Sequence, residues 1–459
     1  MKHSSPLYLT IVLIGLTQQL FAANPILQTK FTADPAPLVA NGKVYLYTSH
    51  DEDDAPAGMA GFRMKDWQCY TSTDMVNWTD HGTLATLAVF PWAEQTNDAW
   101  APQVIERNRK FYLYAPVSIP GWPKNAIGVA VADNPLGPFK DALGHPLVGP
   151  ETGFIDPTVF IDDDGQAYLF WGNPQLWYVK LNEDMISYSG DIIEDASIAK
   201  TEGQPDPYHY QEGPWVYKRN EHYYCAYATT CCPEDIGYAM SNSPEGPWEF
   251  QNYIIHPDSR SSGNHPGIID YRGHSYVFGF NYKINFAITE EHHERRSVCV
   301  SQFEYNEDGT IPELPWWEET EQVDQLEHLN PFARTEAETI CWSEGIKSDR
   351  DPQNGMFIYP TRNGAYTQVK GVDFGEEGAN TFTACIQYGG KEIDCQIELH
   401  IGSVDGEIIG SLPLNPTDTW LNKTISVHAP GGVHDLFLVF KGNSIDQLKL
   451  DYWQFMIRG

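Results

Sequence analysis

One pattern recurs five times in the first three hundred residues and constrains the fold more than any other feature. Each copy is a turn followed by an apolar run around a tyrosine, and successive tyrosines lie 53 to 67 residues apart. Five near-equal groups of short strands predict a five-bladed β-propeller rather than a sandwich, whose strands need not repeat as groups. The five copies are "GKVYLYTS" (Tyr45), "RKFYLYAP" (Tyr112), "GQAYLFWG" (Tyr168), "EHYYCAYA" (Tyr223) and "GHSYVFGF" (Tyr276).

Each unit also has a proline 9 to 11 residues before its tyrosine. If the blades are equivalent, the residues ahead of these prolines should form a ring where the innermost strands begin. The ring then gathers three carboxylates and a histidine at one mouth of the propeller. Its members are Asp34, Ala101, Asp156, Glu212 with Gly213, and His265.

The third unit contains four aspartates, which we assign to two different roles. Asp162, Asp163 and Asp164 precede Gly165 between two predicted strands, a composition typical of a hairpin turn rather than of a calcium loop. Asp156 instead falls in the ring, so we predict that it is the functional one.

Three carboxylates at one mouth point to glycoside hydrolysis. One carboxyl group donates a proton to the leaving oxygen, and another activates water or attacks the sugar. A third raises the pKa of the acid by like-charge repulsion. Asp34, Asp156 and Glu212 supply that number, whereas each one alone would be typical of a turn or cap. His265 is a candidate ligand of a hard cation such as calcium, with water completing the shell.

The charge and the N-terminus restrict the partners and the location. The 29 basic and 62 acidic residues give a formal net charge of −33, which argues against nucleic acid and favours a neutral substrate. Residues 1–23 carry an early Lys, an apolar stretch from Leu7 to Leu16 and Phe21-Ala22-Ala23, which is typical of a secretory signal peptide. No later apolar run approaches the ~20 residues of a membrane span. We expect an exported protein, secreted or periplasmic, with no membrane anchor.

The motifs of the repeat together resemble glycoside hydrolase family 43, whose five-bladed propellers cleave arabinofuranosyl and xylosyl linkages with inversion. They are "FTADPAPLVANGKVYLY", "NDAWAPQVI", "GFIDPTVFIDDDG", "YQEGPWVYK", "SGNHPGIID" and "RRSVCVSQFEYNEDGTI". The resemblance implies that Asp34 is the general base, Asp156 the pKa modulator and Glu212 the general acid.

Three further residues take roles from the same resemblance. His265 matches a metal-binding histidine at the propeller centre, so calcium is the implied ion, and no organic cofactor is expected. Arg296 matches an arginine that reaches the sugar, and Trp100 lies where the family often offers an aromatic face. Without the resemblance, Arg296 reads as a surface salt bridge and Trp100 as a core residue.

The pattern changes after the propeller, which we assign to residues 24–325. Residues 332–459 read as alternating strands and resemble the β-sandwich carbohydrate-binding module of family six. The resemblance implies a structural calcium at Glu336, Glu338 and Asp451, although strand-end carboxylates are the plain alternative. Tyr366 and Trp420 are candidate sugar-binding aromatics, and a module that only packs on the propeller is the other possibility.

The cysteines leave two pairings open. Cys385 and Cys395 flank Gly390 symmetrically and would face each other if that segment is a hairpin, so a disulfide there is one of two alternatives. Cys231 and Cys232 have no second cysteine pair at ligand spacing, and we expect buried or loop thiols rather than a metal site.

These observations lead to one main prediction of function. We expect an exported, monomeric inverting glycoside hydrolase that releases α-L-arabinofuranosyl side groups from arabinoxylan or its oligosaccharides. The alternatives are an exo-acting β-xylosidase on xylooligosaccharides or a bifunctional enzyme, then an arabinan-active enzyme, and last a non-catalytic sugar-binding propeller. A non-catalytic propeller would be expected to lack one of the three carboxylates, and none is missing.

Overall fold

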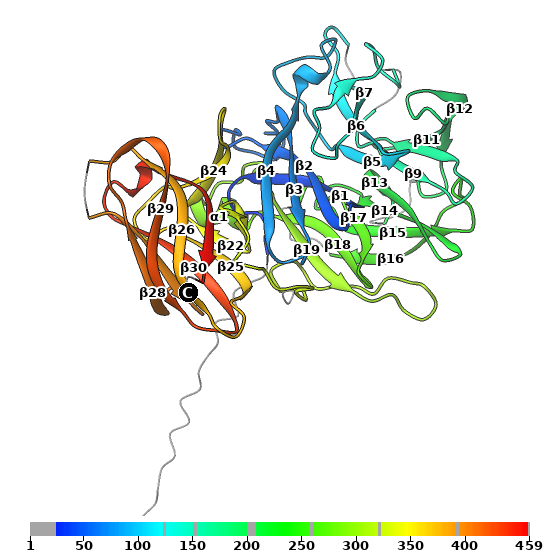
Figure 1. Ribbon diagram of the computed structural model, residues 1–459. Coiled ribbons are helices and arrows are strands. Elements are labelled where there is room, and N and C mark those ends of the chain that lie inside the picture. The colour runs from blue at the N-terminus through cyan, green and yellow to red at the C-terminus, as the bar shows by residue number, and fades with distance from the viewer. Residues whose placement is uncertain are drawn as a thin grey trace, which may run out of the picture.

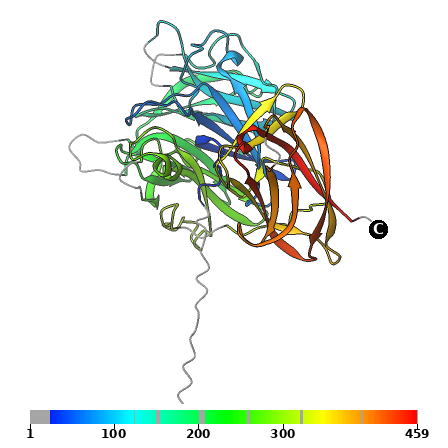
Figure 2. The ribbon, with the colours of Figure 1, turned by 90° about the vertical axis from the view of Figure 1, so that its left-hand side faces the viewer.

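The predicted all-β fold is confirmed by the computed structural model shown in Figure 1. It describes residues 24–122, 125–149, 154–199, 208–256, 261–319, 323–391 and 394–457, so the predicted signal peptide lies outside the described residues. A blue-to-green part and a yellow-to-red part lie side by side in Figures 1 and 2. Described helices are limited to α1 (Lys283–Ile288), η1 (Leu87–Val89) and η2 (Ile445–Gln447). None of them is long and apolar enough to cross a membrane.

Five antiparallel sheets form the blades of the predicted propeller. Each repeated tyrosine lies on the second strand of its blade, which explains the regular spacing in the sequence. The strands are β1 (Phe31–Ala40), β2 (Lys43–Asp51), β3 (Asp66–Ser72) and β4 (Trp78–Thr86) in blade I; β5 (Gln103–Arg107), β6 (Lys110–Ser118), β7 (Asn125–Ala132) and β8 (Lys140–Asp141) in blade II; β9 (Thr158–Ile161), β10 (Ala167–Trp171), β11 (Leu176–Leu181) and β12 (Tyr188–Asp195) in blade III; β13 (Tyr210–Arg219), β14 (His222–Thr229), β15 (Ile236–Ser241) and β16 (Glu249–Ile255) in blade IV; and β17 (Gly267–Tyr271), β18 (His274–Asn281) and β19 (Ser297–Phe303) in blade V.

The N-terminal segment closes the ring of blades. Ile26 N donates to Val298 O at 2.9 Å, and Thr32 N donates to Arg296 O at 2.8 Å. Asn24, which is fully buried, exchanges two side-chain hydrogen bonds with the backbone of Val300, each of 2.9 Å. The segment thus lies along the free edge of β19 before the chain enters β1, and it ties the last blade to the first.

The aspartate cluster of blade III forms the expected turn between β9 and β10. Gly165 N donates to Asp162 O at 2.8 Å, and Gly165 adopts a φ of 86°. Asp162 also accepts a 2.8 Å hydrogen bond from the hydroxyl of Tyr223. The cluster therefore shapes a turn, whereas Asp156 lies before the strand.

Two packed sheets form the C-terminal sandwich around their own apolar core. The alternating pattern of its strands is that of sheets with one buried face. One sheet contains β23 (Ile346–Asp351), β24 (Gly355–Pro360), β31 (Leu448–Met456), β26 (Ala379–Tyr388) and β29 (Thr417–Ala429), with β20 (Thr335–Glu336) on β31; the other contains β22 (Trp342–Glu344), β25 (Tyr366–Asp373), β30 (Val433–Lys441), β27 (Gln396–Ile401) and β28 (Glu407–Pro413).

The structure differs from the expectations for both cysteine pairs. Cys385 and Cys395 are free, buried thiols, because β26 and β27 belong to different sheets and do not form a hairpin. The expectation of free thiols at Cys231 and Cys232 is also wrong, since these adjacent, exposed residues form a disulfide.

A short strand joins the two parts of the chain. β21 (Thr339–Ile340) pairs with β4 and becomes the fifth strand of blade I. Beside it, the buried hydroxyl of Ser348 donates to Asp80 Oδ2 at 2.6 Å, and Arg350 Nη2 donates to His81 O at 2.6 Å. The sandwich is therefore hydrogen-bonded to the propeller rather than tethered to it by a free linker.

Candidate active site

The five positions ahead of the prolines meet on the propeller axis. A cavity of about 30 Å³ lies between them and is bordered by the five prolines and by the residue directly before each of them. This space is enough for about one or two water molecules. The first strand of every blade therefore begins beside the same point on the axis, as the equal positions in the repeat predict. The lining includes Asp34, Ala101, Asp156, Gly213 and His265, each with its following proline.

The backbone turns sharply at these positions. Asp34, Asp156 and Gly213 adopt φ values of 53°, 58° and 61°, in the left-handed region. Aspartate tolerates this region better than most residues do, whereas at Gly213 a Cβ would lie only 2.5 Å from the imidazole of His265. Register shifts in β1 after Ala33 and in β13 around Glu212 accompany these turns. Such bulges re-aim side chains next to active sites.

Asp34 is held in place by three donors. The hydroxyl of Ser49 donates to its Oδ2, and Arg296 Nη1 donates to its Oδ1 at 3.1 Å. His265 Nδ1 lies 3.2 Å from the same Oδ1. The carboxylate is almost fully buried, so its orientation is fixed before any substrate arrives.

Arg296 contacts carboxylates on two elements. Its Nε and Nη2 donate to the two oxygens of Asp51 at 2.9 and 3.0 Å, a bidentate pair, while Nη1 reaches Asp34. The guanidinium lies over Phe62 and Phe280, 5.0 and 5.3 Å from the ring centres. Arg296 borders the site, as the resemblance implies, but it is only 2 % exposed, and its main contacts orient Asp34.

His265 lies among the three carboxylates. Its Nε2 is 3.5 Å from Asp156 Oδ2 and 3.4 Å from Glu212 Oε1. Burial opposes the charged imidazolium, but Asp156, Asp34 and Glu212 together raise the pKa of His265 to about 10. Burial also raises the pKa of Asp156 to about 7, with Glu212 and Asp34 adding to the rise and His265 opposing it.

Glu212 projects from the β13 bulge and is bound from the neighbouring blade. Asn173, two residues after the end of β10, donates from Nδ2 to Glu212 Oε2. A second neighbour is Gly263, where a Cβ would lie 3.6 Å from Glu212 Oε1 and 3.1 Å from Arg296 Nη1. The acid side chain is thus confined on both sides while remaining 14 % exposed.

A second cavity of about 220 Å³ opens in front of these groups. Trp100 borders it as predicted, and its backbone carbonyl accepts a 2.6 Å hydrogen bond from Trp67 Nε1. The arrangement can therefore place one neutral ring between an apolar wall and a set of carboxylates. The lining residues are Asp34, Phe62, Met64, Trp100, Ala101, Ile155, Asp156, Asn173, Glu212, Gly263, His265 and Arg296.

Several of these residues escaped the sequence reasoning. Phe62 and Met64 come from the segment between β2 and β3, which has no counterpart in the repeat. Asp51 ends a strand and gives no signal of its partner Arg296. Glu234, buried on the segment before β15, accepts a 3.0 Å hydrogen bond from Asn264 N and so supports the turn that carries His265. Burial, followed by Glu212, raises the pKa of Glu234 to about 8.

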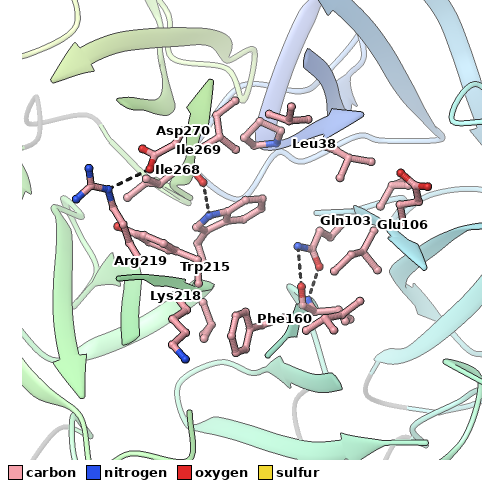
Figure 3. Close-up of a pocket in the computed structure, with 18 of the residues that line it drawn as sticks. Leu38, Gln103, Glu106, Phe160, Trp215, Lys218, Arg219, Ile268, Ile269 and Asp270 are labelled. Carbon is pink, nitrogen blue, oxygen red and sulfur yellow. Dashed lines mark hydrogen bonds and ion pairs between the residues drawn. The ribbon is translucent and has the colours of Figure 1, made fainter. Parts of the chain in front are cut away.

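The opposite mouth of the propeller has a different character. A cavity of about 560 Å³ lies at the far ends of the same inner strands and is drawn in Figure 3. Leu38, Phe160, Trp215 and Ile269 contribute apolar side chains, and Arg219 pairs with Asp270 at 3.0 Å. The three predicted carboxylates therefore belong to one mouth only.

The residues at the axis fit the predicted metal ion. Ligand atoms of Asp156, Glu212 and His265 lie within 4.8 Å of one another. Carboxylate oxygens are the donors that calcium prefers, and three carboxylates around one imidazole leave an excess of negative charge. A hard cation with water in its shell suits this donor set.

The structure does not assemble the calcium site predicted in the second domain. The carboxylates of Glu336, Glu338 and Asp451 do not form a ligand cluster within the described ranges. Arg334 lies between two of them, donating to Glu336 at 2.8 and 2.9 Å and to Asp451 at 3.1 Å. Glu338 is buried, and its Oε2 has no hydrogen-bond partner among the described residues, so burial raises its pKa well above the usual value. A guanidinium supplies the positive charge at this point.

The two candidate aromatics of the sandwich do not face each other. Tyr366 lies on β25, 6 % exposed, with its hydroxyl bonded to Glu344 at 3.0 Å. Trp420 lies on β29 in the other sheet and packs against Phe357 with ring centres 5.8 Å apart. A sugar ring held between these two side chains is therefore not supported.

Comparison with known families gives two matches along the chain. Residues 22–311 match the family described as glycosyl hydrolases family 43. Residues 336–456 match the carbohydrate binding module (family 6). The two matches coincide with the propeller sheets and with the sandwich.

Relatives and solved structures agree with these matches. The chain is 31 % identical to an arabinoxylan arabinofuranohydrolase of Bacillus subtilis, with 95 % of this chain and 93 % of that protein covered. It is 30 % identical to a beta-xylosidase of Xylanibacter ruminicola over 63 % of this chain and 98 % of that protein. The crystal structure of the Bacillus subtilis family 43 arabinoxylan arabinofuranohydrolase with cellotetraose superimposes with a TM-score of 0.79 at 29 % identity, covering 95 % of this chain and 98 % of that one. A calcium-free beta-xylosidase/alpha-arabinofuranosidase from a compost metagenome covers 64 % of this chain and 97 % of its own, with a TM-score of 0.57 and 28 % identity.

The buried cluster predicts that stability falls as the pH rises. The pKa values of Asp156 and His265 are both raised on folding, to about 7 and about 10. The folded state then holds more protons than the unfolded state, so stability is greatest below the unfolded pKa and is lost as the pH passes the folded pKa. We expect the free energy of unfolding in urea to be ~1–3 kcal/mol lower at pH 8.5 than at pH 5.5.

The variant Asp156→Asn removes one of these titrating groups. It should show a smaller decline over this pH range, whereas Asp191→Asn, an exposed change on β12, should decline as the unchanged protein does. Equal slopes for Asp156→Asn and the unchanged protein would contradict the raised pKa.

Proposed function

The chain belongs to glycosyl hydrolase family 43, and we propose that this glycoside hydrolase releases α-L-arabinofuranosyl side groups from arabinoxylan or its oligosaccharides. The observation that carries the proposal is a cavity of about 220 Å³ that holds Asp34, Asp156 and Glu212 together. It is smaller than the ~300–1,000 Å³ of typical ligand pockets, so it suits a single sugar residue. A one-sugar cavity favours removal of a terminal or side group over cleavage within a chain.

The choice of sugar rests on the relatives. Two arabinoxylan arabinofuranohydrolases, from Bacillus subtilis and Paenibacillus polymyxa, are 31 % identical and cover 95 % and 94 % of this chain, through both propeller and sandwich. The beta-xylosidase of Xylanibacter ruminicola, at 30 % identity, covers 63 %. An exo-acting β-xylosidase with the same three carboxylates is therefore the second candidate.

In the proposed reaction Asp34 acts as the general base. It deprotonates a water molecule, which attacks the anomeric carbon from the face opposite the leaving group. Inverting enzymes keep base and acid ~6.5–9.5 Å apart to admit this water. The imidazole of His265 lies between Asp34 and Glu212 and keeps the two carboxyl groups apart. Arg296 fixes the direction of the base through its 3.1 Å bond to Asp34.

Glu212 acts as the general acid and protonates the departing glycosidic oxygen. Asp156 modulates it, because two carboxyl groups held around one imidazole resist ionising together. Burial is the largest cause of the raised pKa of Asp156, and Glu212 and Asp34 add to it. Trp100 offers the apolar wall against which the sugar ring packs.

The proposal extends to the metal, the location and the second domain. His265, through its neutral imidazole, would hold a calcium ion with water completing the shell, and the ion would offset part of the negative charge of the nearby carboxylates. The sequence of residues 1–23 supports export to the periplasm or the medium, and the exported protein is proposed to act as a monomer. The match to a carbohydrate binding module supports retention of the enzyme on xylan.

The experiment that tests the proposal identifies the released sugar. Purified protein is incubated with wheat arabinoxylan and, separately, with unsubstituted xylooligosaccharides, and the monosaccharides are separated by chromatography. We expect arabinose from the polymer and no cleavage of the oligosaccharides. Xylose from the oligosaccharides would favour the β-xylosidase, and no product from either would contradict both.

The acid assignment predicts an effect that depends on the leaving group. Glu212→Gln keeps the size and the hydrogen bond from Asn173 but removes the proton. Arabinose release from arabinoxylan should fall by about 10²–10⁴-fold, while hydrolysis of 4-nitrophenyl α-L-arabinofuranoside, whose leaving group needs little protonation, should fall far less. Glu249→Gln, an exposed change on β16, serves as the control. Equal losses on both substrates would refute the assignment.

Removal of the proposed calcium should change stability as well as activity. Dialysis against a chelator should lower the melting temperature by several degrees, because an ion that binds only the folded state stabilises it. Added Ca²⁺ should restore it, and metal analysis of the restored protein should find about one ion per chain. His265→Asn should remove both the bound ion and the response. An unchanged melting temperature with no ion detected would rule the site out.

A further inference from the structure

Three consecutive residues at the start of blade IV bind the end of blade III. Tyr210 donates its hydroxyl to Gly172 O at 2.6 Å, and Gln211 Nε2 donates to Asn173 Oδ1 at 3.0 Å. Asn173 Nδ2 then donates to Glu212 Oε2. The segment after β10 is thereby fixed against the strand that carries the proposed acid.

The same segment is tied to the carboxylate of its own blade. Gly172 N donates to Ile155 O at 3.0 Å, and Ile155 directly precedes Asp156. Ile155 and Asn173 both border the 220 Å³ cavity. The end of β10 therefore connects the modulator in blade III with the acid in blade IV.

Gln211 determines which way the Asn173 amide points. An asparagine amide presents an oxygen on one side and an NH₂ on the other. Because the Gln211 Nε2 donor occupies the oxygen, the NH₂ is directed at Glu212. A reversed amide would bring two donors together at Gln211 and would take the Asn173 donor away from Glu212 Oε2.

Glu212 needs such a partner because its other neighbours hold it weakly. Its contact with His265 is 3.4 Å, at the long limit of a hydrogen bond, and no hydrogen bond joins it to the neighbouring carboxyl group of Asp156 among the described contacts. A glutamate with three rotatable bonds loses effectiveness if its carboxyl group samples several orientations. Asn173 supplies a short, directed contact on the side away from the imidazole.

We propose that Asn173 is a positioning residue, oriented by Gln211, that holds the Glu212 carboxyl group in the direction needed to protonate the departing glycosidic oxygen. This inference rests on the proposed role of Glu212 as the acid. Asn173 acts through Glu212, so its loss should impair proton donation more than sugar binding.

The test uses a double-mutant cycle on two substrates. Asn173→Ala should lower kcat on an arabinoxylan oligosaccharide by about 10²-fold with little change in KM, because a misplaced catalytic group costs about that much. On 4-nitrophenyl α-L-arabinofuranoside the loss should be below about 5-fold, since that leaving group needs little protonation. Gln211→Ala should cause a smaller loss of the same kind, about 10-fold.

The double variant tells whether Gln211 acts through Asn173 or whether the two residues contribute independently. Asn173→Ala with Gln211→Ala should be no worse than Asn173→Ala alone, because Gln211 acts only through Asn173. Asn252→Ala, an exposed change on β16, is the matched control and should leave both activities unchanged. Gln211 is partly exposed, so Gln211→Ala is expected to fold. Its effect on the two substrates can be measured even if Asn173→Ala folds poorly.

Two results would overturn the inference. Equal losses on both substrates would mean that Asn173 does not serve proton donation, and multiplicative losses in the double variant would mean that Gln211 does not act through it. Glu212→Gln is measured alongside. If the loss in Glu212→Gln does not depend on the leaving group, the assignment of Glu212 as the acid fails. This result distinguishes failure of the acid assignment from failure of the role proposed for Asn173.

Discussion

The site depends on a histidine and an arginine that hold three carboxyl groups together out of water. His265 lies within 3.5 Å of Asp34, Asp156 and Glu212, and Arg296 binds Asp34 from the other side. Buried carboxylates are costly unless they are paired and hydrogen-bonded. The five-bladed arrangement makes the pairing possible, because it brings residues from the first, third, fourth and last units of the chain to one axis.

The sandwich reinforces the blade that carries the proposed base. β21 extends blade I at its outer edge, and Ser348 satisfies the buried carboxylate of Asp80 at 2.6 Å. Lys347 reaches Asp53, just beyond β2, at 2.9 Å. The sandwich therefore contributes to the packing of the propeller whether or not it also binds polysaccharide.

The repeat made the fold and much of the site predictable. Equal spacing of the tyrosines located the second strands, and the shared distance to a proline located Asp34, Asp156 and His265 on one ring. Contacts between elements outside the repeat could not be predicted from the sequence. Phe62 and Met64 come from a segment unique to blade I, and the pairing of Arg296 with Asp51 joins residues 245 positions apart.

The same limit explains the errors in the C-terminal part. Symmetry around Gly390 resembled a hairpin, but β26 and β27 belong to different sheets, so Cys385 and Cys395 do not face each other across a hairpin. Local symmetry predicts a hairpin only where both strands share a sheet. In the propeller each hairpin does, because every blade is built from consecutive strands, and this is why sequence spacing was informative there.

Glu212 departs from the repeat in a way that fits its proposed task. Asp34 and Asp156 directly precede their prolines, whereas Glu212 lies one residue earlier and Gly213 takes the left-handed position. A Cβ at residue 213 would collide with His265, so a carboxylate in register with the other two would displace the imidazole that holds them. Because the acid lies one residue earlier, at Glu212, this collision is avoided. Its side chain is then directed toward the end of β10 in blade III. The acid therefore gains its orientation from a neighbouring blade, through Asn173, rather than from the ring.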